Sequence, residues 1–275
     1  MASTKCAAGS RRAAPGRGDF FEMAGGSRTR TSRGEKVGVG RSQPVQDRIT
    51  GFWSTVAPEY EAHGGNVPAR GSAEFDAWVA AISRLLPAPP ADVLDVATGT
   101  GFAACIAARL GHRVIAIDLA EPMLAEARKA AAEGALEIRF ELRDAVAPAL
   151  PPQSLDAILC RHFIWTLREP ETALRSWLAL LRPGGRVVAI DGCWFRDAAP
   201  TETPDPGAPN LFDRYYTAET REALPAMGFR SPRSVAALFE RAGFARVEVG
   251  DLADVHALAD APPSPEPWYV VVARR

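Results

Sequence analysis

The chain has only four cysteines, and their spacing suits neither a disulfide framework nor a metal site. Cys6, Cys105, Cys160 and Cys193 are scattered over 275 residues and form no C-x-x-C pair. Cysteines placed in this way are typical of reduced thiols in an intracellular protein. We therefore expect no metal centre and a cytoplasmic location.

Long apolar runs and several well-known catalytic motifs are also missing. No stretch reaches the roughly 20 consecutive apolar residues that a helix needs to cross a bilayer. The chain has no P-loop, no Ser-His-Asp order and no zinc-ligand spacing. These absences argue against a membrane protein, a P-loop nucleotidase, a serine hydrolase and a zinc enzyme.

Basic residues are concentrated at the start of the chain. Residues 1–44 contain nine Lys/Arg and three Asp/Glu, whereas the whole chain has a net charge of -1, so residues 45–275 carry -7. A body this acidic suits no nucleic-acid partner. The first 44 residues are rich in Gly, Ser, Ala and Arg, and we expect a disordered basic tail there, with a presequence or a basic arm as alternatives. Residues 45–275 are expected to form one domain, and 47% apolar residues can supply its core.

The most informative stretch is residues 93–101, Val-Leu-Asp-Val-Ala-Thr-Gly-Thr-Gly. A short apolar run ends in a Gly-Thr-Gly turn, and an Ala-rich helical segment follows at once. This pattern predicts a strand, a nucleotide-binding turn and a helix, in which glycines let the backbone approach a ligand closely.

The surroundings of this turn indicate which nucleotide it binds. A pyrophosphate site has a third glycine, but Ala104 stands at that position. Asp95 would repel a pyrophosphate, while it suits an ammonium group. Asp118 ends the next predicted strand, where a carboxylate can accept hydrogen bonds from both ribose hydroxyls. Two carboxylates and no phosphate-binding lysine favour S-adenosylmethionine.

Four segments in this order give the chain a resemblance to the class I S-adenosylmethionine-dependent methyltransferases, in the group that includes small-molecule and ubiquinone/menaquinone enzymes. They are residues 93–101, 118–124, 144–145 and 181–186. One position departs from the family pattern, because Ala97 replaces the first glycine of the turn. A methyl group is tolerated at this position if Ala97 keeps a negative φ.

Alternating strands and helices predict an α/β fold with a Rossmann-like, mostly parallel sheet covered by helices on both faces. The resemblance implies seven strands with a final antiparallel one. Residues 45–86 are expected to form an N-terminal helical cap of two helices. The Pro-rich segment 192–229 interrupts the alternation directly after the fifth strand, which indicates a substrate lid.

The resemblance, together with the rule that ligands bind at the carboxyl ends of parallel strands, implies a set of cofactor-binding residues. Asp144 accepts from the adenine amino group, the Ala145 N–H serves a ring nitrogen, and Leu119 and Met123 cover the base and ribose. The remaining predicted residues approach the turn or the methionine moiety: Tyr60, Asp95, Ala97, Gly99, Gly101, Asp118 and Cys160.

Catalysis of methyl transfer needs alignment and, for some acceptors, a general base. His162 is the first candidate because it follows the fourth strand and has an unperturbed pKa near neutral pH. Asp191 and His63 are the reserves. Arg161 is expected to hold a substrate carboxylate or to orient the site.

Aromatic residues near the predicted site are expected to line the acceptor side. They are Trp165, Trp194, Phe212, Tyr215 and Tyr216. The alternative for these side chains is that they anchor a long loop to the body.

These observations predict a methyltransferase that acts on a small-molecule acceptor, in specialised (secondary) metabolism. C-methylation in quinone biosynthesis is the alternative within the same class. A nicotinamide-dependent oxidoreductase is disfavoured by Asp95 and by the absence of a Tyr-x-x-x-Lys pair, and a cofactor-binding protein without catalysis stays open. We expect neither a membrane partner nor a nucleic-acid partner, and the sequence is compatible with a homodimer. It does not tell which atom accepts the methyl group.

Overall fold

The computed structural model describes residues 45–61, 67–195, 210–229, 231–259 and 268–275. The predicted disordered tail, His63 and much of the predicted lid lie outside the described residues. The division into a tail, a cap and a lid therefore stays a prediction.

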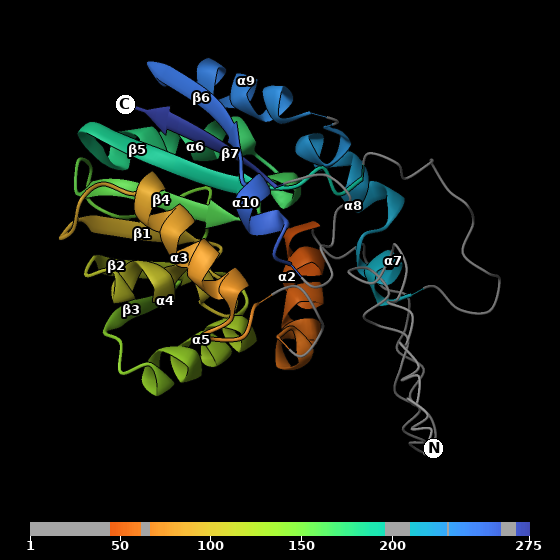
Figure 1. Ribbon diagram of the computed structural model, residues 1–275. Coiled ribbons are helices and arrows are strands. Elements are labelled where there is room, and N and C mark those ends of the chain that lie inside the picture. Colours follow the sequence, from red (N-terminus) through yellow and green to blue (C-terminus); the bar gives the residue numbers. More distant parts are fainter. Residues whose placement is uncertain (1–44, 62–66, 196–209, 230, 260–267) are drawn as a thin grey trace, which may run out of the picture.

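The described residues form one seven-stranded sheet with the order β3-β2-β1-β4-β5-β7-β6 (Figure 1). Strands β1 to β5 are parallel, and β7 runs antiparallel between β5 and β6. This confirms the predicted fold class. The strands are β1 Asp92–Val96, β2 Arg113–Asp118, β3 Ile138–Leu142, β4 Leu155–Arg161, β5 Leu181–Asp191, β6 Arg246–Asp251 and β7 Tyr269–Arg274.

Helices cover both faces of the sheet. Consecutive residues of a strand point to opposite faces, so they pack in different cores. Ile158 of β4 packs in a core with helices α6 (Pro170–Leu180) and α9 (Pro232–Ala242). Leu159 packs in a second core with α3 (Ala73–Leu85) and α4 (Phe102–Arg109). Helix α5 (Glu121–Glu133) packs against β2 and β3. The middle of β4, residues 157–160, is apolar and buried for this reason.

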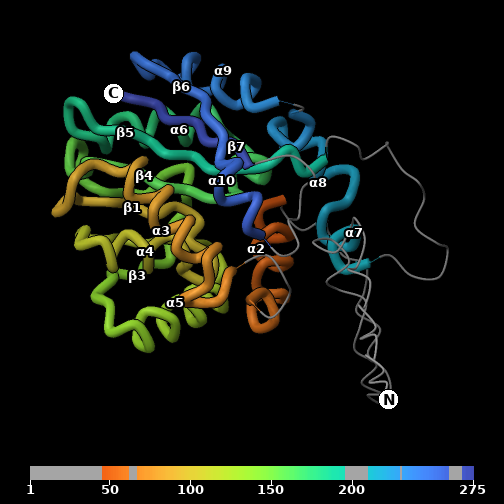
Figure 2. Tube along the Cα trace, in the orientation of Figure 1, coloured from red at the N-terminus to blue at the C-terminus, as the bar shows by residue number. Residues whose placement is uncertain are grey.

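A third core lies beside the sheet and joins segments far apart in the sequence. Helix α2 (Val45–Val56) contacts α5 on one side, and α7 (Leu211–Tyr215) and α8 (Ala218–Glu222) on the other (Figure 2). Two helices are present within residues 45–86, as predicted: α2 belongs to this third core, whereas α3 packs on a face of the sheet. The short helices of the insertion, and α10 (Ala253–His256), were not predicted, since each is one turn or little more.

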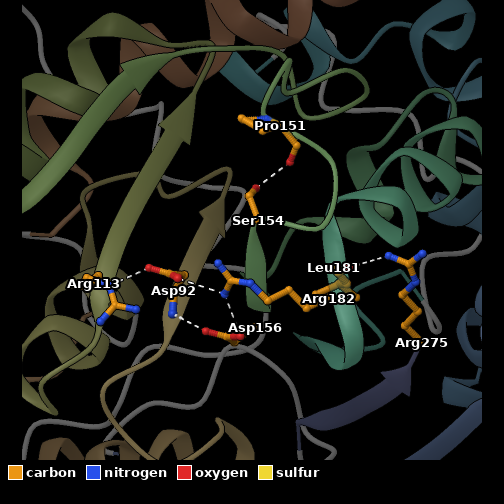
Figure 3. Close-up of polar contacts among 8 residues, drawn as sticks. All are labelled: Asp92, Arg113, Pro151, Ser154, Asp156, Leu181, Arg182 and Arg275. Atoms are coloured by element: carbon orange, nitrogen blue, oxygen red, sulfur yellow. Dashed lines mark hydrogen bonds and ion pairs between the residues drawn. The ribbon is translucent and has the colours of Figure 1, made fainter.

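The amino ends of the central strands are held together by an ion-pair network (Figure 3). Asp92 pairs with Arg113 at 2.7 Å and with Arg182 at 2.9 Å, and Arg182 reaches Asp156 at 2.8 Å. The Asp92 backbone N–H also donates to Asp156 at 2.8 Å. The Arg113 hydrogen bond is the main reason why the pKa of Asp92 lies below its usual range. These contacts tie β1, β2, β4 and the turn that begins β5.

No helix in the described part of the chain combines the length and apolar character required to cross a bilayer.

Candidate cofactor and acceptor site

A cavity that is partly open to solvent lies at the carboxyl ends of β1, β2 and β4. Its walls come from α2, the turn after β1, the start of α5 and the segments that follow β3 and β4. The cavity brings together ten of the predicted site residues, which are Tyr60, Ala97, Gly99, Asp118, Leu119, Met123, Asp144, Ala145, Arg161 and His162.

The turn after β1 has a left-handed backbone at three positions. Gly99 has φ +56° and Gly101 φ +86°, as a glycine-rich turn permits, but Ala97 has φ +53°. Ala97 therefore does not meet the condition of a negative φ. The turn requires this conformation, and an alanine methyl group adopts it at a cost of roughly 1–2 kcal/mol. At Gly99 a side chain would meet open space, so a ligand can approach the backbone there.

Asp118 connects the turn to the second strand and faces the cavity. Its two carboxylate oxygens accept the Gly99 N–H at 2.9 Å and the Ala120 N–H at 2.8 Å. Burial raises the pKa of this carboxyl, although the backbone donors oppose the shift. The group is fixed in place, and each oxygen keeps a second lone pair for a ligand hydroxyl.

Asp95 lies behind the turn and does not line the cavity. Its side chain is buried, with 1% exposure, and accepts the Thr98 hydroxyl at 2.6 Å. Burial raises the pKa of Asp95 to about 7. The carboxyl supports the turn through the Thr98 hydrogen bond.

Two other predicted cofactor residues lie outside the cavity lining. Gly101 packs against Ala127 of α5, and Cys160 is buried with 1% exposure in the core under α6. Asp144 remains at the cavity and accepts the Val146 N–H at 2.8 Å. The Ala145 carbonyl accepts the Trp177 indole N–H at 2.7 Å, which fixes the segment after β3.

Arg161, at the end of β4, is held by aromatic rings. Its guanidinium group lies 4.4 Å from the Phe102 ring centre and 5.1 Å from that of Trp78. It also hydrogen-bonds Tyr60 and interacts with the charge of Asp95. Arg161 and Tyr60 thus form one wall of the cavity near the glycine turn.

His162 is one of the cavity-lining residues, and its imidazole ring is buried. Its backbone is left-handed, with φ +56°, and its N–H donates to Ile190 at 2.8 Å. Neither ring nitrogen has a hydrogen-bond partner among the described residues, and the ring meets the edge of Trp194 at 4.7 Å. Burial and the nearby Arg161 lower the pKa of His162 well below its usual value. The imidazole is neutral at physiological pH.

Asp191, the reserve base, is fully engaged by the protein and does not line the cavity. It accepts the Ile164 N–H at 3.1 Å, the Gly192 N–H at 2.9 Å and the Trp194 indole N–H. Burial raises its pKa to about 7. Its contacts hold Trp194 and the segment after β4 in position, which is a supporting role.

The five predicted aromatic residues do not line the main cavity. Phe212 and Tyr216 stack on each other at 4.3 Å and are buried against Phe52 of α2. The Tyr216 hydroxyl lies 3.1 Å from the Trp53 indole nitrogen and 2.9 Å from the Thr166 hydroxyl. Direct substrate contact therefore receives no support for Trp165, Trp194, Phe212, Tyr215 or Tyr216.

The residues that form the outer wall of the cavity were not predicted from the sequence. They are Gln46, Ile49, Thr50, Trp53, Phe163 and Arg168. Four of these follow the helical spacing i, i+3, i+4, i+7 along α2 and so lie on one face of it. The helical periodicity of residues 45–56 could therefore have indicated that they share a surface.

The sheet order, the glycine turn and an acidic residue at the tip of β2 define a class I S-adenosylmethionine-dependent methyltransferase. The family profile described as "Methyltransferase domain" matches residues 94–189. A demethylmenaquinone methyltransferase of Thermus thermophilus is 33% identical over 178 residues, which cover 60% of this chain and 79% of the relative. The ubiquinone/menaquinone biosynthesis C-methyltransferase UbiE of Roseobacter denitrificans is 29% identical, covering 71% of this chain and 70% of the relative. The chain belongs to this methyltransferase family.

Solved structures agree on the fold. Phosphoethanolamine N-methyltransferase 2 of Haemonchus contortus, in complex with phosphomonomethylethanolamine and S-adenosylhomocysteine, superposes with a TM-score of 0.60 at 18% identity. The match covers 85% of this chain and 61% of that chain.

The protein is a methyltransferase that uses S-adenosylmethionine, as predicted. It is therefore not a nicotinamide-dependent oxidoreductase, which was the alternative. The cavity residues fit this cofactor. Asp118 offers carboxylate oxygens for ribose hydroxyls, Gly99 leaves room for close approach, and Leu119 and Met123 offer apolar cover.

Cofactor affinity is expected to depend on pH through Asp95. Its pKa of about 7 falls when a cationic ligand binds nearby, so binding releases a proton. By linkage, the dissociation constant for S-adenosylmethionine should decrease about 10-fold between pH 6 and pH 7.5. Calorimetric titration measures this. Asp95→Asn should abolish the dependence, whereas Asp191→Asn, which removes a carboxyl with a similar pKa outside the cavity, should leave it. An unchanged pH profile in Asp95→Asn would contradict the assignment.

Proposed function

We propose that this enzyme methylates a small, partly apolar acceptor in specialised metabolism, with His162 accepting a hydrogen bond or a proton from the reacting group. The observation that carries the proposal is the environment of His162. It is a buried imidazole with two unpartnered nitrogens, and it lines the same cavity as Asp118.

S-adenosylmethionine, when bound, supplies an electrophilic methyl group. The protein contributes alignment, which can lower a barrier by roughly 7–11 kcal/mol. Asp118 and Asp144 would hold the nucleoside, and Trp53 with Phe163 would shield the acceptor from water. His162 has a depressed pKa, so it is a weak base that stays in the proton-accepting form over the whole physiological range.

His162→Asn is expected to lower kcat by roughly 100-fold, since general-base contributions are typically 10²–10⁴-fold. Asparagine tolerates the left-handed backbone at this position, so the fold should be retained. The dissociation constant for S-adenosylhomocysteine, measured by calorimetry, should change less than about two-fold. If cofactor affinity falls as much as turnover, His162 serves cofactor binding, and its assignment to the acceptor is incorrect.

C-methylation of a quinol is the second candidate, favoured by relatives named as demethylmenaquinone and ubiquinone/menaquinone methyltransferases. A panel of phenols, amines and quinols, each incubated with S-adenosylmethionine and analysed by mass spectrometry, separates the two. Product from quinols alone would favour the second candidate, and no product from any small molecule would contradict both.

A further inference from the structure

The outer part of the cavity contains a cation that the cofactor residues do not engage. Arg168 follows the turn after β4 and lines the cavity beside Gln46 and Thr50 of α2. Its Nε donates to the Gln46 side-chain oxygen at 2.9 Å, and the Gln46 nitrogen donates to the Thr50 hydroxyl at 3.3 Å. These three side chains form a polar rim between α2 and the segment after β4.

Arg168 differs from the other arginines of the cavity in how its guanidinium is used. Arg143 donates to Glu141 and to the Pro148 and Ala149 carbonyls. Arg161 lies against two aromatic rings and hydrogen-bonds Tyr60. Arg168, within the described residues, comes no closer than 4.0 Å to the Glu169 carboxylate, beyond hydrogen-bonding distance. Its terminal N–H groups are available to a ligand.

Apolar side chains also line this cavity. They include Trp53, Phe163 and Leu167, and Trp53 and Phe163 are only partly buried. The Trp53 ring is held in place by its indole hydrogen bond to Tyr216. A planar apolar body suits such walls, and Arg168 and His162 line the same cavity, where each could meet a polar group of the acceptor.

We propose that Arg168 is an acceptor-binding residue and that the acceptor is a planar, largely apolar molecule that carries a carboxylate. A guanidinium group binds a carboxylate through two parallel N–H donors, and partial burial strengthens the pair. This inference rests on the proposed function, since it names the class of acceptor for the same cavity.

A purely structural role for Arg168 makes different predictions. If its bond to Gln46 only fastens α2 over the cavity, loss of either partner should harm charged and uncharged acceptors alike. Three variants separate the roles. Arg168→Met removes the charge and the bond, Arg168→Lys keeps the charge, and Gln46→Leu removes the bond while it leaves the guanidinium in place.

The probes are protocatechuate and methylcatechol, in which a methyl group replaces the carboxylate on the same ring. Their affinities are measured by calorimetry on the full chain saturated with S-adenosylhomocysteine, and their KM and kcat values in turnover. The wild-type protein should bind protocatechuate roughly 10- to 100-fold more tightly than methylcatechol, as expected for a charge-assisted pair. Arg168→Met should lose this preference, Arg168→Lys should keep part of it, and Gln46→Leu should keep most of it. In turnover, the loss of preference in the Arg168 variants should raise the KM for protocatechuate and leave kcat nearly unchanged.

Equal affinity for the two probes, or no binding of either, would overturn the inference. The inference would also be overturned if Arg168→Met kept the preference for protocatechuate over methylcatechol, or if Gln46→Leu lost that preference as completely as Arg168→Met. Turnover of methylcatechol without any preference for the acid would leave the proposed function standing while this inference fails. Failure to methylate every member of the wider acceptor panel would instead contradict the proposed function.

Discussion

Asp118→Ala is expected to weaken binding of S-adenosylhomocysteine by at least about 100-fold. The carboxylate would offer two charge-assisted hydrogen bonds to ribose hydroxyls, each worth roughly 1.5–3 kcal/mol. The substitution also leaves the Gly99 and Ala120 N–H groups without their acceptor, so the turn loses its connection to β2. Calorimetric titration measures the affinity.

Asp118→Asn is the matched control for this effect. The amide keeps one acceptor oxygen and nearly the same shape, so its loss of affinity should lie between those of the wild-type protein and the alanine variant. Circular dichroism checks that both variants retain the fold. If Asp118→Ala binds the cofactor as tightly as the wild-type protein, the ribose is held elsewhere and the assignment of the cavity must be revised.

Gly101→Ala is expected to destabilise the protein by about 2–5 kcal/mol. Gly101 has φ +86°, and an added Cβ would lie 2.9 Å from the Ala127 Cβ and 3.2 Å from its Cα. The left-handed backbone costs an alanine roughly 1–2 kcal/mol, and a forced shift of α5 adds roughly 1–3 kcal/mol. Urea denaturation measures the free energy of unfolding.

Gly184→Ala isolates the backbone part of this cost. Gly184 has φ +79°, but nothing lies within 4 Å of an added Cβ. This variant should lose only roughly 1–2 kcal/mol. Equal losses at the two glycines would show that α5 moves freely and that close packing at Gly101 contributes little.

The sequence was sufficient to predict the sheet and the cofactor side of the cavity. Asp118 and Asp144 end or follow predicted parallel strands, and parallel strands bring their carboxyl ends to one edge. The position of such residues follows from topology, without knowledge of side-chain packing.

The orientation of side chains in the turn was less predictable. Asp95 stands in the motif, yet its carboxyl points behind the turn to Thr98. The left-handed backbone at Ala97 redirects the chain at this point, and an alanine gives no local signal of it. Strand position alone therefore did not predict that Asp95 lies behind the turn rather than in the cavity lining.

The acceptor side could be predicted least, because its residues depend on packing between distant segments. Phe212 and Tyr216 are large aromatics near a predicted lid, but α2 covers them and they form core. Gln46, Trp53 and Arg168 meet only because α2 folds across the segment after β4. His63, another expected participant, lies outside the described residues.

The ion pairs among Asp92, Arg113, Asp156 and Arg182 lie at the edge of the sheet opposite the cavity. They secure the registration of the central strands without any contribution from the residues that meet ligands. Substitutions on α2 or in the segment after β4 can therefore alter acceptor specificity while this distant ion-pair network maintains the sheet. Directed evolution of this enzyme toward new methyl acceptors can therefore begin with residues of α2 and of the segment after β4.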